Sequence, residues 1–170
     1  MEMCQHLMRQ EGYVEGTTMV VALGSGVYEV VGSWSHPEDG DVLHPYQTML
    51  SVPCNNLSFV GKGEGETIVS GGFVVENGRK VSFEGLTMKD SSGYGLFAIG
   101  AGTEVVLQKV TVENSQSIGV HVEGGAKLDA TMSISSEQRV WGVGEWIHDD
   151  RPSHQLHFSL QQVCWYDCNV

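Results

Sequence analysis

Positive charge is scarce in this sequence, and its scarcity argues against two classes of partner. The 170 residues include 9 Lys and Arg against 21 Asp and Glu, which gives a formal net charge of −12. No long segment is basic, so the chain lacks the cationic surface that binds nucleic-acid phosphates or anionic membranes. We therefore expect neither nucleic acid nor a membrane as partner. An acidic polysaccharide would need a bridging cation such as Ca²⁺.

Long apolar runs are also missing. No stretch approaches the roughly 18 consecutive apolar residues of a membrane-spanning helix. The N-terminal residues MEMCQHLMRQEG contain no basic start followed by an apolar stretch, so we expect no secretory signal, and the location of the protein stays open. The 4 cysteines, Cys4, Cys54, Cys164 and Cys168, match no disulfide framework by their spacing. We therefore expect reduced thiols.

What the sequence does contain is a repeat between Leu57 and Ala126. Apolar residues recur at a constant offset (81 − 57 = 24 and 105 − 81 = 24), and so do the apolar residues two positions later. A column of glycines follows at the same offset. A fixed period of this length is the signature of a solenoid. The three columns are Leu57, Val81 and Val105; Phe59, Phe83 and Leu107; and Gly71, Gly95 and Gly119.

The local pattern within each repeat indicates strands rather than helices. Apolar residues alternate with polar ones in VSFEGLTM (81–88) and VVLQKVTV (105–112). Of the 22 glycines, 14 lie between residues 57 and 126, a density that a helical repeat would not tolerate. We therefore expect parallel strands that stack turn upon turn, with the two apolar columns pointing inward.

Three stretches carry a resemblance to a known superfamily. They are VVALGSGVYEV (20–30), LSFVGKGEGETIVSGG (57–72) and FEGLTMKDSSGYGLFAIGAGTEVVLQKVTVENSQSIGVHVEGGA (83–126). Over these residues the chain resembles the right-handed parallel β-helix superfamily, the pectin-lyase-like fold. The resemblance implies an all-β, right-handed parallel β-helix (β-solenoid) of about four to five rungs. It is specific for the fold and says little about activity.

The ends of the chain depart from the repeat. We place an N-terminal cap at residues 1–16, with a short helix near Met3–Arg9, the β-helix at 17–136, and an irregular C-terminal tail or edge cap at 137–170. Within the tail, QLHFSLQQV (155–163) alternates and could form a capping strand. If the last rung were left uncovered, its unpaired edge would favour self-association.

One polar column offers candidate chemistry. Asp90 and Asn114 recur at the repeat offset (114 − 90 = 24), next to Lys89 and Glu113. A carboxylate and an amide on one face could hold a cation or a sugar, and Lys89, Asp90 and Glu113 are the candidate acids and bases. The competing interpretation, which we favour, is a polar ladder that caps backbone groups in a turn.

A second column holds aromatic rings. Phe73, Phe97 and His121 recur at the same offset (97 − 73 = 24 and 121 − 97 = 24). Exposed on one face, the rings would form a flat strip for stacking sugars or a partner, and with Asn114 they are the candidate binding residues. His121 is also a candidate acid or base beside Glu123, although we favour a surface ring that stacks on Phe97.

The tail contains residue types that bind metals. His148, Asp150, His154 and His157 are weak candidate ligands, because their spacing matches no established site. A string such as His-Asp-Asp-Arg-Pro is usually a solvated loop, so we expect no metal here.

The resemblance implies two enzyme activities to weigh. Lyases of the superfamily use acidic residues to bind Ca²⁺ and an Arg or Lys as base, and the related hydrolases use clustered aspartates. The repeat contains one aspartate, Asp90, whereas glycoside cleavage needs paired carboxylates. We therefore predict a non-catalytic scaffold or binding module for carbohydrate or a protein partner, without a cofactor. The alternative is a polysaccharide lyase or glycoside hydrolase, or a truncated relative of one, with Ca²⁺.

Overall fold

Residues 16–35, 46–134, 140–142 and 155–160 are the part of the chain that the structure, a computed structural model, describes. They form an all-β parallel solenoid of about four turns and contain no helix, as the repeat predicted. The strands are β1 (Met19–Ala22), β2 (Gly26–Glu29), β3 (Met49–Ser51), β4 (Leu57–Val60), β5 (Thr67–Ser70), β6 (Gly72–Val75), β7 (Lys80–Lys89), β8 (Leu96–Ile99), β9 (Glu104–Glu113), β10 (Val120–Glu123), β11 (Lys127–Ile134), β12 (Val140–Gly142) and β13 (Gln155–Leu160).

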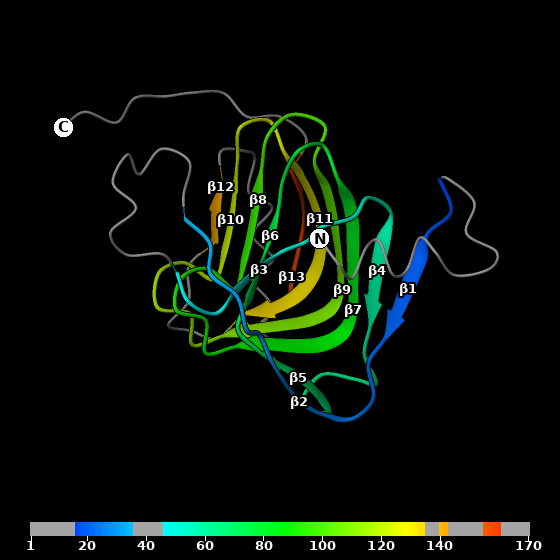
Figure 1. The fold of residues 1–170 in the computed structure, drawn as a ribbon, viewed down its shortest axis with the longest axis vertical. Coiled ribbons are helices and arrows are strands. Elements are labelled where there is room, and N and C mark those ends of the chain that lie inside the picture. Colours follow the sequence, from blue (N-terminus) through cyan, green and yellow to red (C-terminus); the bar gives the residue numbers. More distant parts are fainter. Residues whose placement is uncertain (1–15, 36–45, 135–139, 143–154, 161–170) are drawn as a thin grey trace.

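The strands build two sheets that face each other across the core (Figure 1). The first sheet has the order β1-β4-β7-β9-β11-β13, with β5 pairing with both β2 and the second half of β7. The second sheet has the order β12-β10-β8-β6-β3. Every pair among the described strands is parallel except β11 with β13. Parallel neighbours follow because each turn of the chain passes the same positions in the same direction.

The inward columns of the first sheet form the core. Leu57, Val81 and Val105 lie side by side on successive strands and are all buried, as predicted from the repeat. Leu128 extends this buried column at an offset of 23 residues (128 − 105 = 23), which the 24-residue repeat did not predict. The next inward column brings Phe59 onto Phe83, with ring centroids 5.1 Å apart and the planes almost parallel at 6°. Phe73 from the second sheet reaches across to Phe83 at 4.8 Å. These three rings join the two sheets.

A loop changes its place between two successive turns. Gly85 alone turns the chain inside β7, with φ of 61°, and six residues (90–95) then separate β7 from β8. In the preceding turn the order is reversed, because the six residues 61–66 separate β4 from β5 and Gly71 alone separates β5 from β6. The strands and loops therefore add up to the same repeat length, although the loop sits at a different corner.

The moved loop changes the register of the second sheet by one residue. Because β6 pairs with β8 at an offset of 23 residues (96 − 73 = 23), Gly72 lies beside Gly95, and the predicted glycine column is wrong at Gly71. A Cβ on Gly72 would lie 1.9 Å from the carbonyl oxygen of Tyr94, and a Cβ on Gly95 would lie 2.7 Å from that of Gly119. Glycine is required here because the backbones of successive turns approach each other so closely.

The C-terminal residues extend both sheets. Gln155–Leu160 forms β13, which runs antiparallel along the edge of β11, consistent with the capping strand predicted from its alternation. β12 pairs in parallel with β10 at an offset of 20 residues (140 − 120 = 20), so the second sheet continues past residue 136 although the 24-residue period has ended. The predicted N-terminal helix near Met3–Arg9 lies outside the described residues.

Two further findings bear on the expectations from composition. Among the described residues, no helix is long and apolar enough to cross a membrane. Cys54 is disulfide-bonded, and its residue is only 2% exposed. The expectation of reduced thiols is therefore wrong at this position. Spacing along the chain could not reveal the bond, because the solenoid brings together residues that are far apart in sequence.

We expect Phe83→Ala to destabilise the protein by about 3–5 kcal/mol, because the substitution leaves a cavity between two packed rings. Unfolding in urea, followed by circular dichroism, would measure the change in free energy of unfolding. Phe83→Leu is the matched control and should cost about half as much, since it keeps most of the apolar volume. A loss below about 1 kcal/mol for Phe83→Ala would contradict the packing described here.

Candidate functional site

Three of the predicted catalytic residues meet at the corner that follows β7 and β9. Lys89 and Glu113 are register partners at the ends of the two strands, and Asp90 and Asn114 follow them. The side-chain amide of Asn114 donates a hydrogen bond to Oδ1 of Asp90, and Lys89 Nζ lies 3.9 Å from Oδ2 of Asp90. Asp90 and Asn114 therefore form a polar ladder through their side chains, and the capping of backbone groups that the sequence suggested stays a prediction.

The backbone explains why Asp and Asn occupy this corner. Asp90 and Asn114 have φ of 57° and 52°, in the left-handed region where these two residue types are tolerated best after glycine. Each residue turns the chain out of the first sheet, and its side chain then pairs with its equivalent on the next turn. The ladder thus has a structural role that accounts for both residues.

The predicted exposed aromatic strip is wrong. Phe73 is 2% exposed and Phe97 is 0% exposed. Since Phe73 lies beside Leu96 and not beside Phe97, it points into the core. A shift of one residue in register moves a side chain to the opposite face of the sheet, and the repeat offset did not reveal this shift.

Phe97 does point outward, but other aromatic rings cover it. Tyr94 stacks on it at 4.9 Å and Trp34 packs against it at 5.1 Å. Trp34 and Tyr46 form an isolated antiparallel bridge with backbone hydrogen bonds of 2.8 and 2.9 Å, and both rings pack beside the second sheet. Together with Met49 and Val74, these rings form a second apolar cluster outside the solenoid core. Such a cluster serves packing rather than the stacking of a ligand.

His121 lies on the second sheet next to Phe97, with ring centroids 4.9 Å apart, but the two rings are tilted by 47° and not stacked as the favoured interpretation had it. Its side chain is only 13% exposed, so it is less of a surface ring than expected. Its Nε2 lies 3.4 Å from Oε2 of Glu123, the pairing considered in the acid–base interpretation. Nearby, burial raises the pKa of Tyr94 to about 12, with smaller contributions from Tyr46 and Glu123. The phenol of Tyr94 is therefore protonated at neutral pH.

The weak candidate metal ligands lie mostly outside the described residues. His148, Asp150 and His154 lie there, and His157 occupies a position on β13 opposite Thr131. Among the residues that the structure describes, no three His, Cys, Asp or Glu side chains gather in a way that could hold a metal ion.

The outer face of the first sheet presents ordered columns of exposed or half-buried side chains. Residues at alternate positions of β4, β7, β9 and β11 point away from the core, and register partners form columns across the strands. Neighbouring strands in a sheet are about 4.8 Å apart, so each column repeats at that spacing. The columns are Lys80, Glu104 and Lys127; Val20, Ser58, Ser82, Val106 and Asp129; and Ala22, Val60, Glu84, Gln108 and Thr131.

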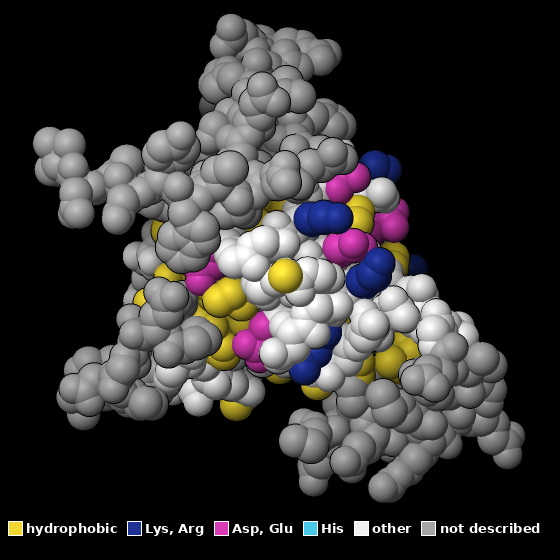
Figure 2. Space-filling view, turned by 90° about the horizontal axis from the view of Figure 1, so that it is seen from above, with side chains coloured by type: hydrophobic (Ala, Val, Ile, Leu, Met, Phe, Trp, Pro, Cys, Tyr) yellow, Lys and Arg dark blue, Asp and Glu magenta, His cyan; other side chains and the backbone are white. Residues whose placement is uncertain are grey.

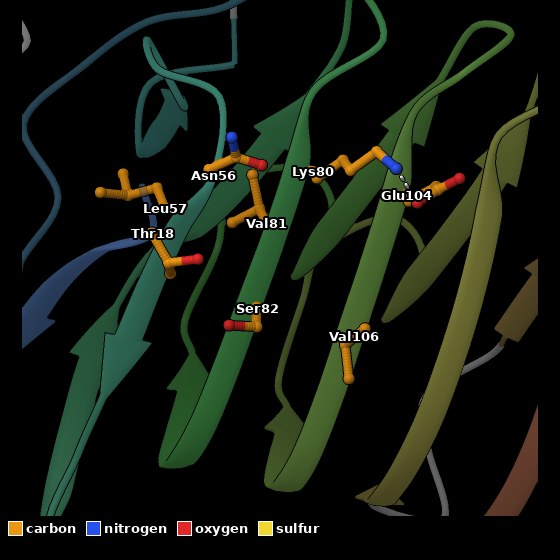
Figure 3. A pocket seen from close by; sticks show the side chains of 8 residues that line it. All are labelled: Thr18, Asn56, Leu57, Lys80, Val81, Ser82, Glu104 and Val106. Carbon is orange, nitrogen blue, oxygen red and sulfur yellow. Dashed lines mark ion pairs between the residues drawn. The ribbon is translucent and has the colours of Figure 1, made fainter. Parts of the chain in front are cut away.

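A groove of about 220 Å³ lies on this face, near the start of the strands (Figure 3). It crosses four strands or their leading turns, and it combines an apolar floor with hydroxyl, amide and charged groups. The hydroxyl of Ser82 donates to the hydroxyl of Ser58 at 2.8 Å on the neighbouring strand. The lining residues are Thr18, Asn56, Leu57, Lys80, Val81, Ser82, Glu104 and Val106.

Charges at the groove are paired across strands. Lys80 Nζ lies 2.8 Å from Oε2 of Glu104, and Lys127 Nζ lies 3.9 Å from its other oxygen. The hydrogen bond and charge of Lys80, helped by Lys127, lower the pKa of Glu104 below its ordinary value. Figure 2 shows Lys and Arg side chains intermixed with Asp and Glu rather than gathered by sign. The groove therefore offers donors and acceptors without a strong net charge.

Sequence reasoning missed this groove. Lys80 and Glu104 stand at the repeat offset (104 − 80 = 24), and Ser58 and Ser82 do as well (82 − 58 = 24). The 24-residue offset between these outward-facing polar residues could therefore have indicated the groove. The groove contains neither a pair of acids nor an aromatic ring, the two features on which the sequence-based candidates depended.

We expect Asn114→Ala to destabilise the protein by about 2 kcal/mol, because it loses a hydrogen bond and places alanine in the left-handed region. Asn114→Gly loses the same bond but accepts the backbone conformation, so about 1 kcal/mol is expected. Urea unfolding of both variants would separate the two contributions. Equal losses would contradict a role for the left-handed conformation.

We also expect Lys80→Met to raise the pKa of Glu104 toward its ordinary value. A lowered folded-state pKa contributes stability above the unfolded-state pKa, and this contribution is lost as pH falls through the folded-state pKa. The variant should therefore lose less stability on acidification than the unchanged protein. NMR titration of the carboxyl carbon would measure the pKa, with Lys89→Met as the control that leaves it in place. An unchanged pKa in Lys80→Met would disprove the pairing.

No family model, no curated protein and no solved structure matches this chain. The assignment of the chain as a parallel β-solenoid therefore rests on its own sequence and structure alone. Its function has to be inferred from the geometry of its surfaces.

Proposed function

We propose that this chain is a non-catalytic binding module that holds a carbohydrate on the outer face of the first sheet. The observation that carries the proposal is the groove lined by Lys80, Ser82, Glu104 and Asn56, in which polar groups lie on neighbouring strands of the first sheet. A rigid sheet places these groups before the ligand arrives, so little conformational entropy is lost on binding.

The chemistry of the groove suits a hydroxyl-rich ligand. Ser58 and Ser82 hydroxyls, the Asn56 amide and the Lys80–Glu104 pair supply both donors and acceptors. Val106 adds an apolar surface for the C–H face of a sugar ring. Because the charge of Lys80 is balanced by that of Glu104 among the groove-lining residues, the groove favours a neutral sugar over a polyanion.

The protonation states favour binding over glycoside hydrolysis. A general acid must hold its proton near the working pH, whereas Lys80 lowers the pKa of Glu104 and keeps it ionised. Asp90 is engaged by Asn114 and Lys89 at the corner of the solenoid. These carboxylates already have partners within the protein that explain their presence.

The resemblance to the pectin-lyase-like superfamily supports a carbohydrate as ligand. The parallel solenoid found here agrees with that resemblance, and the finer assignment to the superfamily is part of this proposal. The same resemblance supplies the second candidate, a polysaccharide lyase or glycoside hydrolase that uses Lys89, Asp90 and Glu113. The observation in its favour is that these three residues do gather at one corner.

Titration calorimetry with neutral oligosaccharides would test the proposal. We expect the double variant Lys80→Ala, Glu104→Ala to bind at least tenfold more weakly, since the loss of charge-assisted hydrogen bonds costs about 1.5–3 kcal/mol. Lys89→Ala, which changes a lysine at the distant corner, is the matched control. Binding that is unaffected by the double variant would place the ligand elsewhere.

The enzyme alternative has a separate readout. Incubation with uronate-containing polysaccharides and Ca²⁺ would release an unsaturated product that absorbs in the ultraviolet. Turnover that disappears in Asp90→Ala would overturn the non-catalytic proposal. Absence of turnover together with saturable sugar binding would support it.

A further inference from the structure

The first turn of the solenoid is the apolar end of the molecule. Four large hydrophobic side chains are exposed among the described residues, and all of them belong to this turn: Val20 (62%), Val27 (62%), Tyr28 (37%) and Val31 (92%). Such residues are normal when scattered singly, but here all four fall within one turn of the solenoid. A shallow groove of about 420 Å³, lined in part by Val30, Val31 and Thr48, lies in the same turn.

The same turn presents unpaired strand edges. Among the described strands, β1 pairs only with β4 and β2 only with β5. The amides of Met19 and Leu23 donate to β4 residues or their neighbours at 2.8 Å, so the backbone groups of Val20 and Ala22 point to the opposite, open side. Open edges of this kind are templates for pairing with another strand.

The core also ends here without a polar cap among the described residues. Met19, Val21, Leu23 and Val30 point toward the core cluster but are only partly buried. A solenoid normally needs a polar outer face on its terminal repeat to remain soluble. This end therefore has apolar side chains, open backbone groups and an incompletely covered core in one place.

The near absence of charge in the first turn indicates which kind of partner surface can pack against it. Between Gly16 and Ser35, Glu29 is the single charged residue, in a chain whose net charge is −12. An uncharged edge of this composition matches another edge of the same composition, and two copies can approach here with little repulsion at the contact. A charged partner would leave its charges desolvated against valine side chains.

The other end of the solenoid cannot accept this turn as a further rung. Stacking a first turn onto a last turn would require β1 of a second copy to lie parallel beside β11. That position is occupied by β13, which runs antiparallel to β11. Head-to-tail growth of the parallel solenoid is therefore blocked in the first sheet.

We infer that two copies of this chain associate through their first turns, with β1 pairing antiparallel to β1 of the second copy about a two-fold axis. The contact uses the same surface on both copies, so it closes at two and does not continue into a fibre. Val20 of each copy then lies beside β1 of the other copy on the joined sheet, and the two core ends face each other. The groove on the first sheet lies on a lateral face and stays open, so the inference does not depend on the proposed ligand.

Sedimentation velocity of the full chain over a wide concentration range would test this inference. We expect a reversible monomer–dimer equilibrium, and we expect Val20→Lys combined with Val27→Lys to weaken dimerisation at least tenfold. The matched control is the double variant Gln108→Lys, Thr131→Lys, because it adds the same charge on the inner strands β9 and β11. Circular dichroism would verify that each variant keeps its strands.

Hydrogen exchange distinguishes strand pairing from loose apolar contact. The amides of Val20 and Ala22 should exchange more slowly as the protein concentration rises, whereas exposed amides in the turns should not change. A monomer at every concentration, an open-ended series of larger species, or equal dissociation by the control variant would each overturn the inference.

Discussion

Parallel hydrogen bonding between equivalent strands of successive turns is the constraint on which the rest of this structure depends. Each strand of the first sheet pairs with the strand one turn away, and this pairing places like residues next to each other. Phe59 stacks on Phe83 for that reason, and Leu57, Val81 and Val105 form a continuous buried column. No single turn could bury these side chains alone, so the core exists only because the turns are stacked.

The same constraint shapes the surface. Stacking brings Ser58 to Ser82, Lys80 to Glu104 and Asp90 to Asn114, so that polar groups pair across turns just as apolar groups do inside. At the corner, the pairing stabilises a left-handed turn. On the open face of the first sheet, it leaves a groove whose groups are held in place by their neighbours. At the corner, Asp90 and Asn114 both adopt a left-handed backbone conformation. On the open face, the paired residues Ser58 and Ser82, and Lys80 and Glu104, lie on strands.

The ends of the solenoid show what happens when stacking stops. At the C-terminal end β13 covers β11, and it does so in the antiparallel direction, which ends the repeat. At the N-terminal end of the described chain, β1 has a neighbour on one side only, and exposed valines gather there. The asymmetry between a covered end and an open end is the physical basis for association through like ends. The groove on the lateral face of the first sheet stays accessible in both the monomer and the dimer.

Alternation and a constant offset of 24 residues predict the strands, the turns and the two inward columns of the first sheet, because they report which side chains share a face. The position of the loop within each turn could be seen only in the folded chain, since moving six residues from one corner to the next leaves the repeat length unchanged. That hidden shift turned Phe73 inward, while the packing of Trp34 covered Phe97, so the predicted aromatic face became part of two apolar clusters. The bond of Cys54 was equally invisible, because contacts between distant segments leave no periodic signal in the chain.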